Sequence, residues 1–353
     1  MIERAREALE AGRLREAIRL LPRASRVPAP LRPERDLIEA EALRGQGYFA
    51  RAEAIYRRLL KARPSGDPVL WLEAALGSAS GLRSVGRAAE ASRILDQAGR
   101  IARRERWARA RIRLERVLVA RAEGRWSAAL AELNDMLQAA LGAADRQQAS
   151  FLTWAVGGAL RFSGDLAGAR RSFERSLGLA RRARDASAEG YALFGLGGVT
   201  RILGRLRESE RFYSRAMRAF TGTEDLFAQA YAHCGLANSL RQQGRRGEAE
   251  RHYRLAHRLY SKLGDEVDLA YVDWGLGKLR LDQGRVTQAS KFLELAMGAF
   301  RRGGELRGEC LSELALAQVQ HARGRVAAAE ALFDRAVRRA KAGGLHTHLE
   351  VFT

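Results

Sequence analysis

Apolar residues recur along the chain at the three- and four-residue spacing of an amphipathic helix, and single glycines interrupt the runs. In residues 187–221 the first run contains Leu193, Leu196, Val199, Ile202 and Leu203, and the second contains Phe212, Tyr213, Ala216 and Phe220. Gly204 lies between them, and glycine is a common helix terminator because the left-handed conformation costs it little. No segment alternates apolar and polar residues as a strand does. The pattern therefore predicts helical hairpins joined at a glycine.

This hairpin pattern repeats along the whole chain. A glycine followed five residues later by Ala or Ser occurs nine times, at Gly12, Gly47, Gly86, Gly124, Gly164, Gly204, Gly244, Gly284 and Gly324. The last five steps between these glycines are each 40 residues long. Self-similarity at a fixed period predicts a stack of equivalent units. We therefore expect an all-α fold, a solenoid of about nine helix-turn-helix repeats.

The repeat resembles the tetratricopeptide repeat. The shared motif places a small residue seven before the glycine, Ala five after it, an aromatic nine after it and Ala twelve after it; one copy reads Ala237, Gly244, Ala249, Tyr253 and Ala256. Some copies depart from it, with leucine at the aromatic place (Leu95, Leu133, Leu293). The 40-residue period resembles that of kinesin-light-chain and polarity-adaptor repeats, and of helical sensor domains in bacterial regulators. The resemblance implies a right-handed superhelix whose concave side binds a partner.

The spacing and the prolines suggest a division of the chain. We expect a short first repeat at 1–21 and a proline-rich linker at 22–33, which holds four of the six prolines. Eight repeats would follow at 34–342, and 343–353 would form a cap or a frayed tail. The ends of a poorly capped solenoid expose apolar faces, so self-association through them is conceivable.

Composition narrows the class of protein. Two cysteines cannot build a disulfide framework, and no apolar run is long enough for a membrane span. The N-terminus lacks a secretory signal, and these features together predict a cytoplasmic location. The formal net charge is +21, and arginine supplies nearly all of the basic residues. Such a surface attracts acidic partners, although arginine is also simply a good helix former.

An arginine recurs at one register of the repeat. The resemblance implies that the first helix of each hairpin lines the groove, with positions 13, 10, 6, 3 and 2 residues before the loop glycine facing inward. Three residues before the glycine, six consecutive repeats carry arginine: Arg44, Arg83, Arg121, Arg161, Arg201 and Arg241. We call these residues the arginine ladder. An arginine in the last helical turn also complements the helix dipole, so a purely structural role stays open.

Aromatic residues accompany the ladder in four repeats, at the positions 10 and 13 before the glycine. The predicted partner-binding residues are Arg121, Phe151, Trp154, Arg161, Tyr191, Phe194, Arg201, Tyr231, Asn238, Arg241, Tyr271, Trp274 and Lys278. Guanidinium groups beside rings suit an extended acidic peptide, and they also suit single-stranded nucleic acid. The first hypothesis is a non-enzymatic adaptor that binds an acidic or aromatic-containing segment of another protein. The alternatives are a superhelix that binds RNA or DNA and a ligand-sensing regulatory protein.

Signals for catalysis and for cofactors are absent. Gly77-Ser78-Ala79-Ser80-Gly81 has alanine where a nucleophile elbow needs serine, and there is no phosphate-binding loop ending in Gly-Lys-Ser/Thr. His233, Cys234, His252 and His257 fall within one repeat, but their spacing matches no common metal site. The sequence therefore predicts no enzyme activity, no metal and no cofactor. Nine arginines between Arg100 and Arg121 are interpreted as a solvated helix face or as a docking patch for an acidic surface.

Overall fold

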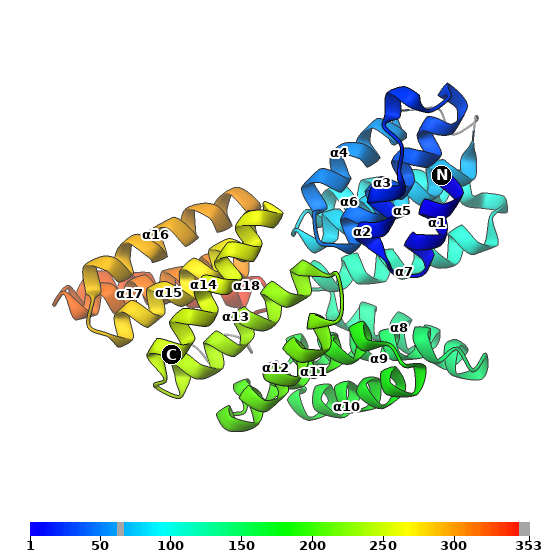
Figure 1. Cartoon of the computed structure of the whole chain (residues 1–353). Helices are drawn as coiled ribbons and strands as arrows, with labels where there is room; N and C mark the ends of the chain where they lie inside the picture. The colour runs from blue at the N-terminus through cyan, green and yellow to red at the C-terminus, as the bar shows by residue number, and fades with distance from the viewer. Residues whose placement is uncertain (62–66, 346–353) are drawn as a thin grey trace. The chain divides into compact units, whose positions relative to one another are not determined.

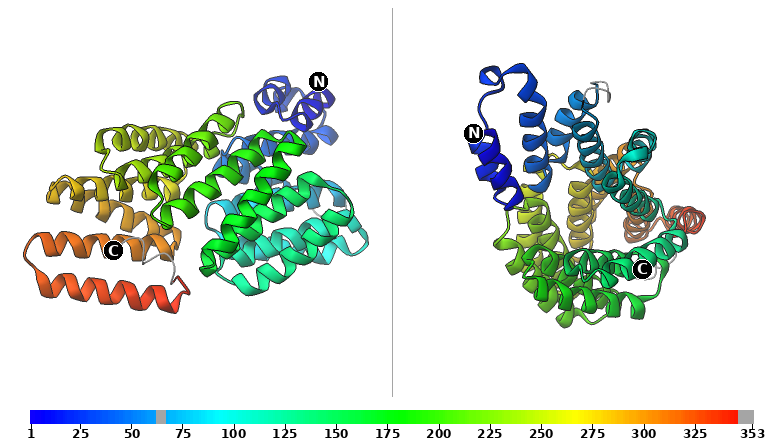
Figure 2. Two further views of the ribbon diagram at one scale, coloured as in Figure 1. Left: turned by 90° about the horizontal axis from the view of Figure 1, so that it is seen from below. Right: turned by 90° about the vertical axis from the view of Figure 1, so that its right-hand side faces the viewer.

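The computed structural model describes residues 1–61 and 67–345, and these residues are helical throughout, with no strand (Figures 1 and 2). The eighteen α-helices of the described part are α1 (Ile2–Glu10), α2 (Leu14–Leu20), α3 (Arg32–Gly45), α4 (Phe49–Leu60), α5 (Pro68–Ser84), α6 (Ala88–Ile101), α7 (Arg106–Ala122), α8 (Trp126–Gly142), α9 (Arg146–Ser163), α10 (Leu166–Ala183), α11 (Ala186–Ile202), α12 (Leu206–Thr221), α13 (Leu226–Gln242), α14 (Arg246–Leu263), α15 (Glu266–Asp282), α16 (Val286–Gly303), α17 (Leu306–Ala322) and α18 (Val326–Ala342). The predicted all-α class is confirmed. The handedness of the solenoid and the exact number of repeats stay predictions.

Glycine ends the first helix of every hairpin, as the spacing predicts. The nine repeat glycines all have positive φ, between 71° and 100°. This is the left-handed region, which a residue with a Cβ enters only at a cost, so glycine is the residue that the tight turn requires. The turn sends the second helix back along the first, which produces the antiparallel hairpins seen in Figure 1.

The small residue five positions after each glycine lies where the two helices of a hairpin cross. All nine of these residues are buried: Ala17, Ala52, Ala91, Ala129, Ala169, Ser209, Ala249, Ala289 and Ala329. The aromatic place four residues further on is filled by the largest core side chains, including Tyr56, Phe173, Tyr213 and Tyr253. Phe333 of α18 is the exception, with 42% exposure, and no further helix follows α18 among the described residues. Each repeat is thus completed by the next one.

Contacts divide the chain into two compact units. Unit 1 comprises Met1–Glu123 with the short segments Glu224–Phe227 and Leu263–Asp265, and unit 2 comprises the other residues from Gly124 onward. The repeat spacing does not mark this boundary. The segment expected to be a linker, 22–33, contains the short 3₁₀ turns Ala24–Arg26 and Ala29–Leu31. The sequence-based division stays a prediction, and residues 346–353 of the expected tail lie outside the described residues.

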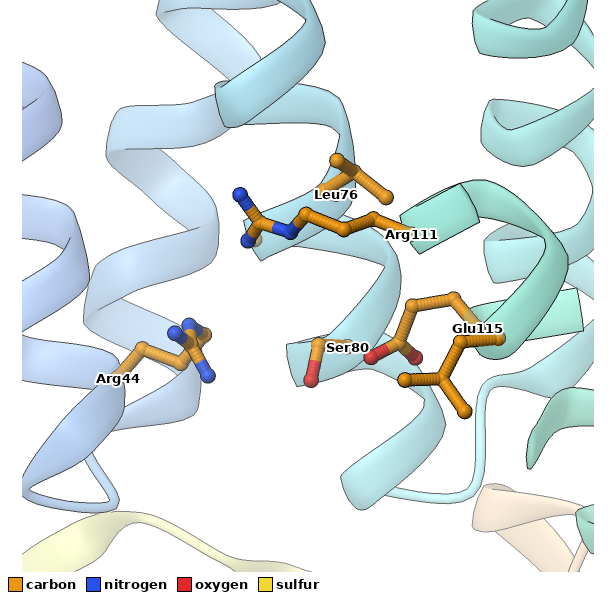
Figure 3. A pocket seen from close by; sticks show the side chains of 7 residues that line it. Arg44, Leu76, Ser80, Arg111 and Glu115 are labelled. Carbon is orange, nitrogen blue, oxygen red and sulfur yellow. The ribbon is translucent and has the colours of Figure 1, made fainter. Parts of the chain in front are cut away.

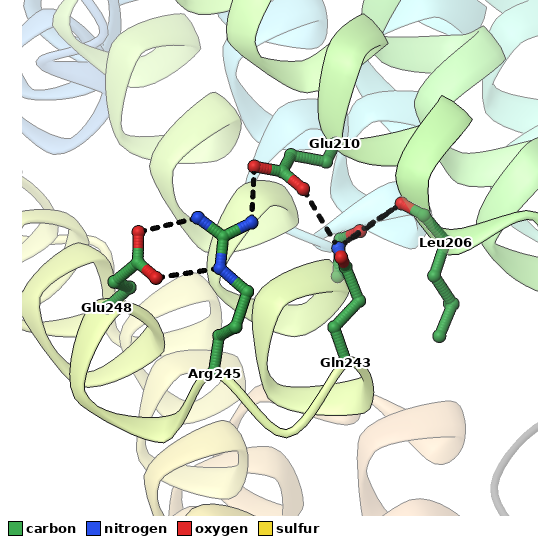
Figure 4. A network of polar contacts seen from close by, with 6 residues as sticks. Leu206, Glu210, Gln243, Arg245 and Glu248 are labelled. Carbon is green, nitrogen blue, oxygen red and sulfur yellow. Dashed lines mark hydrogen bonds and ion pairs between the residues drawn. The ribbon is translucent and has the colours of Figure 1, made fainter.

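Polar networks tie neighbouring hairpins of unit 2 together. At the loop between α13 and α14, both oxygens of Glu248 accept from the Arg245 guanidinium, at 2.7 and 2.6 Å. The same guanidinium donates to Glu210 of α12 at 2.6 Å, and Gln243 donates to Glu210 and to the Leu206 carbonyl (Figure 4). Arg245 is thus engaged inside the stack rather than toward a partner.

Candidate ligand-binding face

The first helix of each hairpin lies on the inner side of the bend within its unit. In unit 1, α1 contacts α3, α3 contacts α5 and α5 contacts α7; in unit 2, α9 contacts α11 and α15 contacts α17. Among the described helix pairs, the second helices of two neighbouring hairpins do not contact each other as extensively as the first helices do. Helices that reach their second neighbours lie on the shorter side of a curved stack. The odd-numbered helices therefore present the inner face, on which the arginine ladder was predicted.

Three members of the arginine ladder are held in ion pairs within the stack. Arg44 pairs with Glu41 at 2.5 Å, Arg83 with Glu115 at 3.0 Å, and Arg241 with Asp282 at 3.0 Å. Arg241 is only 9% exposed. Burial lowers the pKa of Arg241, but nearby Tyr253 and Asp282 outweigh it and raise the pKa. Each of these guanidinium groups already donates to a carboxylate of its own chain, which occupies part of its N–H donors.

Arg161 differs from these three. Among the described residues, no carboxylate lies within ion-pair distance of Arg161, and its Nε is buried with no hydrogen-bond partner. Its guanidinium carbon lies 4.7 Å from the centre of the Phe162 ring. Burial lowers the pKa of Arg161, and the positive charges of Arg307 and Arg201 lower it further. The inner face of unit 2 thus contains a partly buried cation that has no counter-ion among the described residues.

Arg307 joins this cluster, and the sequence analysis missed it. It lies in the first turn of α17, 17 residues before the loop glycine, outside the five registers taken as groove positions. Its guanidinium carbon is 5.3 Å from the centre of the Tyr271 ring, and Nη1 donates to the Tyr271 hydroxyl at 3.4 Å. Its Nε is buried without a partner. At this register the four preceding repeats carry Gln147, Ser187, Phe227 and Val267, so the isolated arginine was the available signal.

The predicted aromatic residues meet one another along the inner helices. Ring centroids of Phe151 and Trp154 are 5.7 Å apart, and those of Trp154 and Tyr191 are also 5.7 Å apart. Phe194 stacks on Tyr231 at 3.7 Å. Tyr271 packs against Phe300 of α16, its ring centre 4.7 Å away. The predicted stripe is therefore physically contiguous from Phe151 to Tyr191 and again from Phe194 to Tyr231.

Exposure separates these rings into two groups. Phe194 and Trp274 are buried, at 7% and 4% exposure, and the Trp274 indole donates to the Leu311 carbonyl at 3.1 Å. These two rings pack between repeats. Phe151 is 37% exposed, and Trp154 and Tyr191 are partly exposed. Tyr231 and Tyr271 are also partly exposed, so a ligand on this face would meet Phe194 and Trp274 last; that any of these rings binds a ligand stays a prediction.

Asn238 and Lys278 are engaged within the chain. The Asn238 side-chain oxygen accepts from the Tyr253 hydroxyl at 2.8 Å, and its amide donates to the Cys234 carbonyl. Lys278 donates to Gln318, and burial together with nearby Arg241 lowers the pKa of its ammonium to about 8. Arg201 lies on α11 in unit 2, whereas Arg121 lies in the last turn of α7 in unit 1. The other predicted residues all lie in unit 2.

Both cysteines and the neighbouring pair His233 and His252 lie in unit 2. Cys234 and Cys310 are buried thiols, and burial raises their pKa values to about 12 and about 11. Nδ1 of His233 lies 2.9 Å from Nδ1 of His252. Within the described ranges, no cluster of three or more His, Cys, Asp or Glu residues has metal-binding geometry. Nor is any helix of these ranges sufficiently long and apolar to cross a bilayer.

Comparison with known proteins agrees with this architecture. Residues 189–262 match the family model of the tetratricopeptide repeat. A search of curated proteins finds no match. Residues 189–262 thus match tetratricopeptide repeats, and the consecutive helical hairpins of the described residues pack side by side.

Three solved structures show the same fold at 12% sequence identity. A Rap protein complexed with competence and sporulation factor has a TM-score of 0.72, covering 97% of this chain and 97% of that chain. The apo form of the quorum sensor NprR from B. thuringiensis has a TM-score of 0.60, covering 96% and 97%. Aspartyl phosphate phosphatase F from Bacillus subtilis has a TM-score of 0.56, covering 96% and 92%. At this identity the likeness concerns the fold alone.

Proposed function

We propose that the protein is a non-enzymatic binding module that holds an extended segment of a partner protein or peptide on the inner face of unit 2. The observation that carries the proposal is Arg161, a partly buried arginine whose buried Nε has no partner and which has no carboxylate within ion-pair distance among the described residues. Burying an unpaired charge costs several kcal/mol, so a fold retains one where it has a use. A carboxylate from outside the chain would supply the missing counter-ion.

The surroundings of Arg161 suit a peptide carboxylate. Arg307 lies close enough to interact with Arg161, and Tyr231 and Tyr271 flank the two guanidinium groups. Hydrogen bonds from guanidinium to carboxylate are charge-assisted and contribute about 1.5–3 kcal/mol each. The exposed rings of Phe151, Trp154 and Tyr191 would contact apolar side chains of the same segment. The anionic contact in this proposal is thus Arg161 with Arg307, rather than the whole arginine ladder.

The comparisons support a peptide as the class of ligand. One structure of similar fold was determined in complex with the competence and sporulation factor, and another is a quorum sensor. Each of these structures covers nearly the whole of this chain. A regulator that acts by binding, in the cytoplasm and without chemistry of its own, is the function that these observations favour.

A peptide selection tests the proposal. The full chain is used to select from a phage-displayed library of short peptides, and enriched peptides are synthesised with and without their carboxylates. Their affinities are measured for the native protein, for Arg161→Met and for Arg323→Met, which removes an exposed arginine of the loop after α17. We expect acidic or carboxylate-dependent peptides and a loss of about 10- to 100-fold in Arg161→Met alone.

Two outcomes would overturn the proposal. One is enrichment of peptides whose binding ignores both their carboxylates and Arg161. The other is tight, Arg161-dependent binding of a mixed-sequence RNA oligonucleotide in place of any peptide, which would favour the nucleic-acid hypothesis instead.

A further inference from the structure

Unit 1 contains a hollow on its own inner face. Its volume is about 340 Å³, including the open space at its mouth. Arg44 of α3, Leu76 and Ser80 of α5, and Arg111, Leu114 and Glu115 of α7 line it (Figure 3). Every lining residue comes from the first helix of a hairpin and from unit 1 alone. The hollow therefore does not share residues with the proposed peptide site of unit 2.

The carboxylates beside the hollow are already satisfied. Glu41 accepts from Arg44 at 2.5 Å and from the Tyr56 hydroxyl at 2.6 Å. Burial alone would raise the pKa of Glu41, but these partners hold it below its usual value. Glu115 accepts from Arg83 at 3.0 Å. Both acids therefore have an arginine partner, although the Glu115 side chain itself lines the hollow.

The guanidinium groups of Arg44 and Arg111 keep N–H donors directed into the hollow. Figure 3 shows both side chains pointing into it from opposite sides. The Nε of Arg44 is buried without a hydrogen-bond partner. Arg111 forms no ion pair with any described residue; its guanidinium carbon lies 5.9 Å from the centre of the Trp107 ring. Glu73 interacts electrostatically with Arg111 and with Arg6, without reaching ion-pair distance of either.

Gly77 fixes the rear of the hollow. A Cβ at this position would lie 2.4 Å from the Glu41 carboxylate and 2.5 Å from the Tyr56 hydroxyl oxygen. Only glycine allows α5 to approach the Glu41–Tyr56 pair so closely. That pair holds Arg44 in place before any ligand arrives, and such preorganisation reduces the entropic cost of binding.

We propose that unit 1 binds a small ligand through an oxyanion, a carboxylate or a phosphate, between Arg44 and Arg111. Two guanidinium groups on opposite sides of an oxyanion provide charge-assisted hydrogen bonds to several of its oxygens. Leu76 and Leu114 contact an apolar part of the ligand, and the Ser80 hydroxyl adds a polar contact. About 80 Å³ of this space is open to water-sized molecules, well below the volume of drug-sized ligand sites, so the ligand is a small anion rather than a folded partner. The site is independent of the proposed peptide site.

Direct binding measurements on the full chain test this site. The probes are inorganic phosphate, acetate and hexanoate, and their dissociation constants are measured by isothermal titration calorimetry. The variant is Arg111→Gln, on the exposed inner surface, and the matched control is Arg109→Gln, which removes the same charge from the opposite side of α7. Because Arg111 has no ion-pair partner in the described part of the chain, its replacement leaves the fold intact, which circular dichroism verifies.

We expect at least one probe to bind the native protein and Arg109→Gln equally, and to bind Arg111→Gln at least tenfold more weakly. Stronger binding of hexanoate than of acetate identifies a carboxylate site with an apolar wall, whereas a preference for phosphate identifies a phosphate site. Equal affinity of a probe for native protein and Arg111→Gln overturns the proposal. So does the absence of binding by all three probes at millimolar concentration.

Discussion

The arginines at 161 and 241 occupy the same register in different repeats, yet their replacement should change stability in opposite directions. Methionine keeps the apolar stem of arginine and removes its charge. Arg161→Met removes a buried Nε that has no acceptor. It thereby removes a desolvation penalty of about 1–3 kcal/mol. The contact with the Phe162 ring, about 0.5–1 kcal/mol, is lost. The net expectation is a gain of about 1 kcal/mol.

For Arg241→Met the sign reverses. This arginine is 9% exposed, and its loss leaves Asp282 without its partner at 3.0 Å. Breaking a buried ion pair costs about 3–5 kcal/mol. The Asp282 side chain is 32% exposed, so water partly replaces the guanidinium and the loss falls to about 2 kcal/mol.

Thermal and urea unfolding of the full-length variants measure these effects. A change of 1 kcal/mol corresponds to about 2–4 °C for a unit of this size. The buffer must contain no multivalent anions, because such an ion could supply the counter-ion that Arg161 lacks. A loss of stability of about 1 kcal/mol or more in Arg161→Met would refute the reasoning, since it would show that Arg161 supports the fold rather than awaiting a ligand.

Three further predictions concern packing and pH. Gly275→Ala places a Cβ 2.4 Å from a ring carbon of Tyr253 and should lower the free energy of unfolding by about 1–3 kcal/mol. Gly178→Ala lies at an exposed helical site with open space around it and should raise that free energy by about 0.5–1 kcal/mol. Urea unfolding of the two variants compares these effects. Hydrogen bonding from Arg280 lowers the pKa of Glu250 from 4.5 to about 2. The ionised carboxylate should therefore contribute about 1–2 kcal/mol of stability above pH 4.5, after solvent screening, and this contribution should vanish as the pH falls toward 2. Glu250→Gln should abolish this loss of stability in acid. Burial and nearby His252 lower the pKa of His233 from 6.5 to about 4, so the fold should lose stability between pH 6.5 and 4; His233→Gln should flatten the stability profile in that window, and an unchanged profile would contradict the assignment.

The sequence by itself determined the helical hairpins and their spacing. A glycine in the left-handed conformation and a small residue five positions later are local requirements, so they recur in the sequence wherever the structure needs them. The 3.6-residue period also fixes which residues of a helix share a face, and the resemblance to the tetratricopeptide repeat implied which face lines the groove. Arg44, Arg83, Arg161 and Arg241 were predicted in this way.

The tertiary structure decided which of these arginines have a counter-ion. The partner of Arg241 is 41 residues away and that of Arg83 is 32 residues away, in each case on the first helix of the next hairpin, and no local pattern encodes such distances. It also revealed Arg307 and the hollow between Arg44 and Arg111, which depend on the curvature of the stack. The charged residues of a sequence can be counted, but their ion pairs depend on which side chains the packing brings within a few ångströms. An arginine that is paired within the fold supports the structure, whereas an unpaired one is a candidate for binding a ligand.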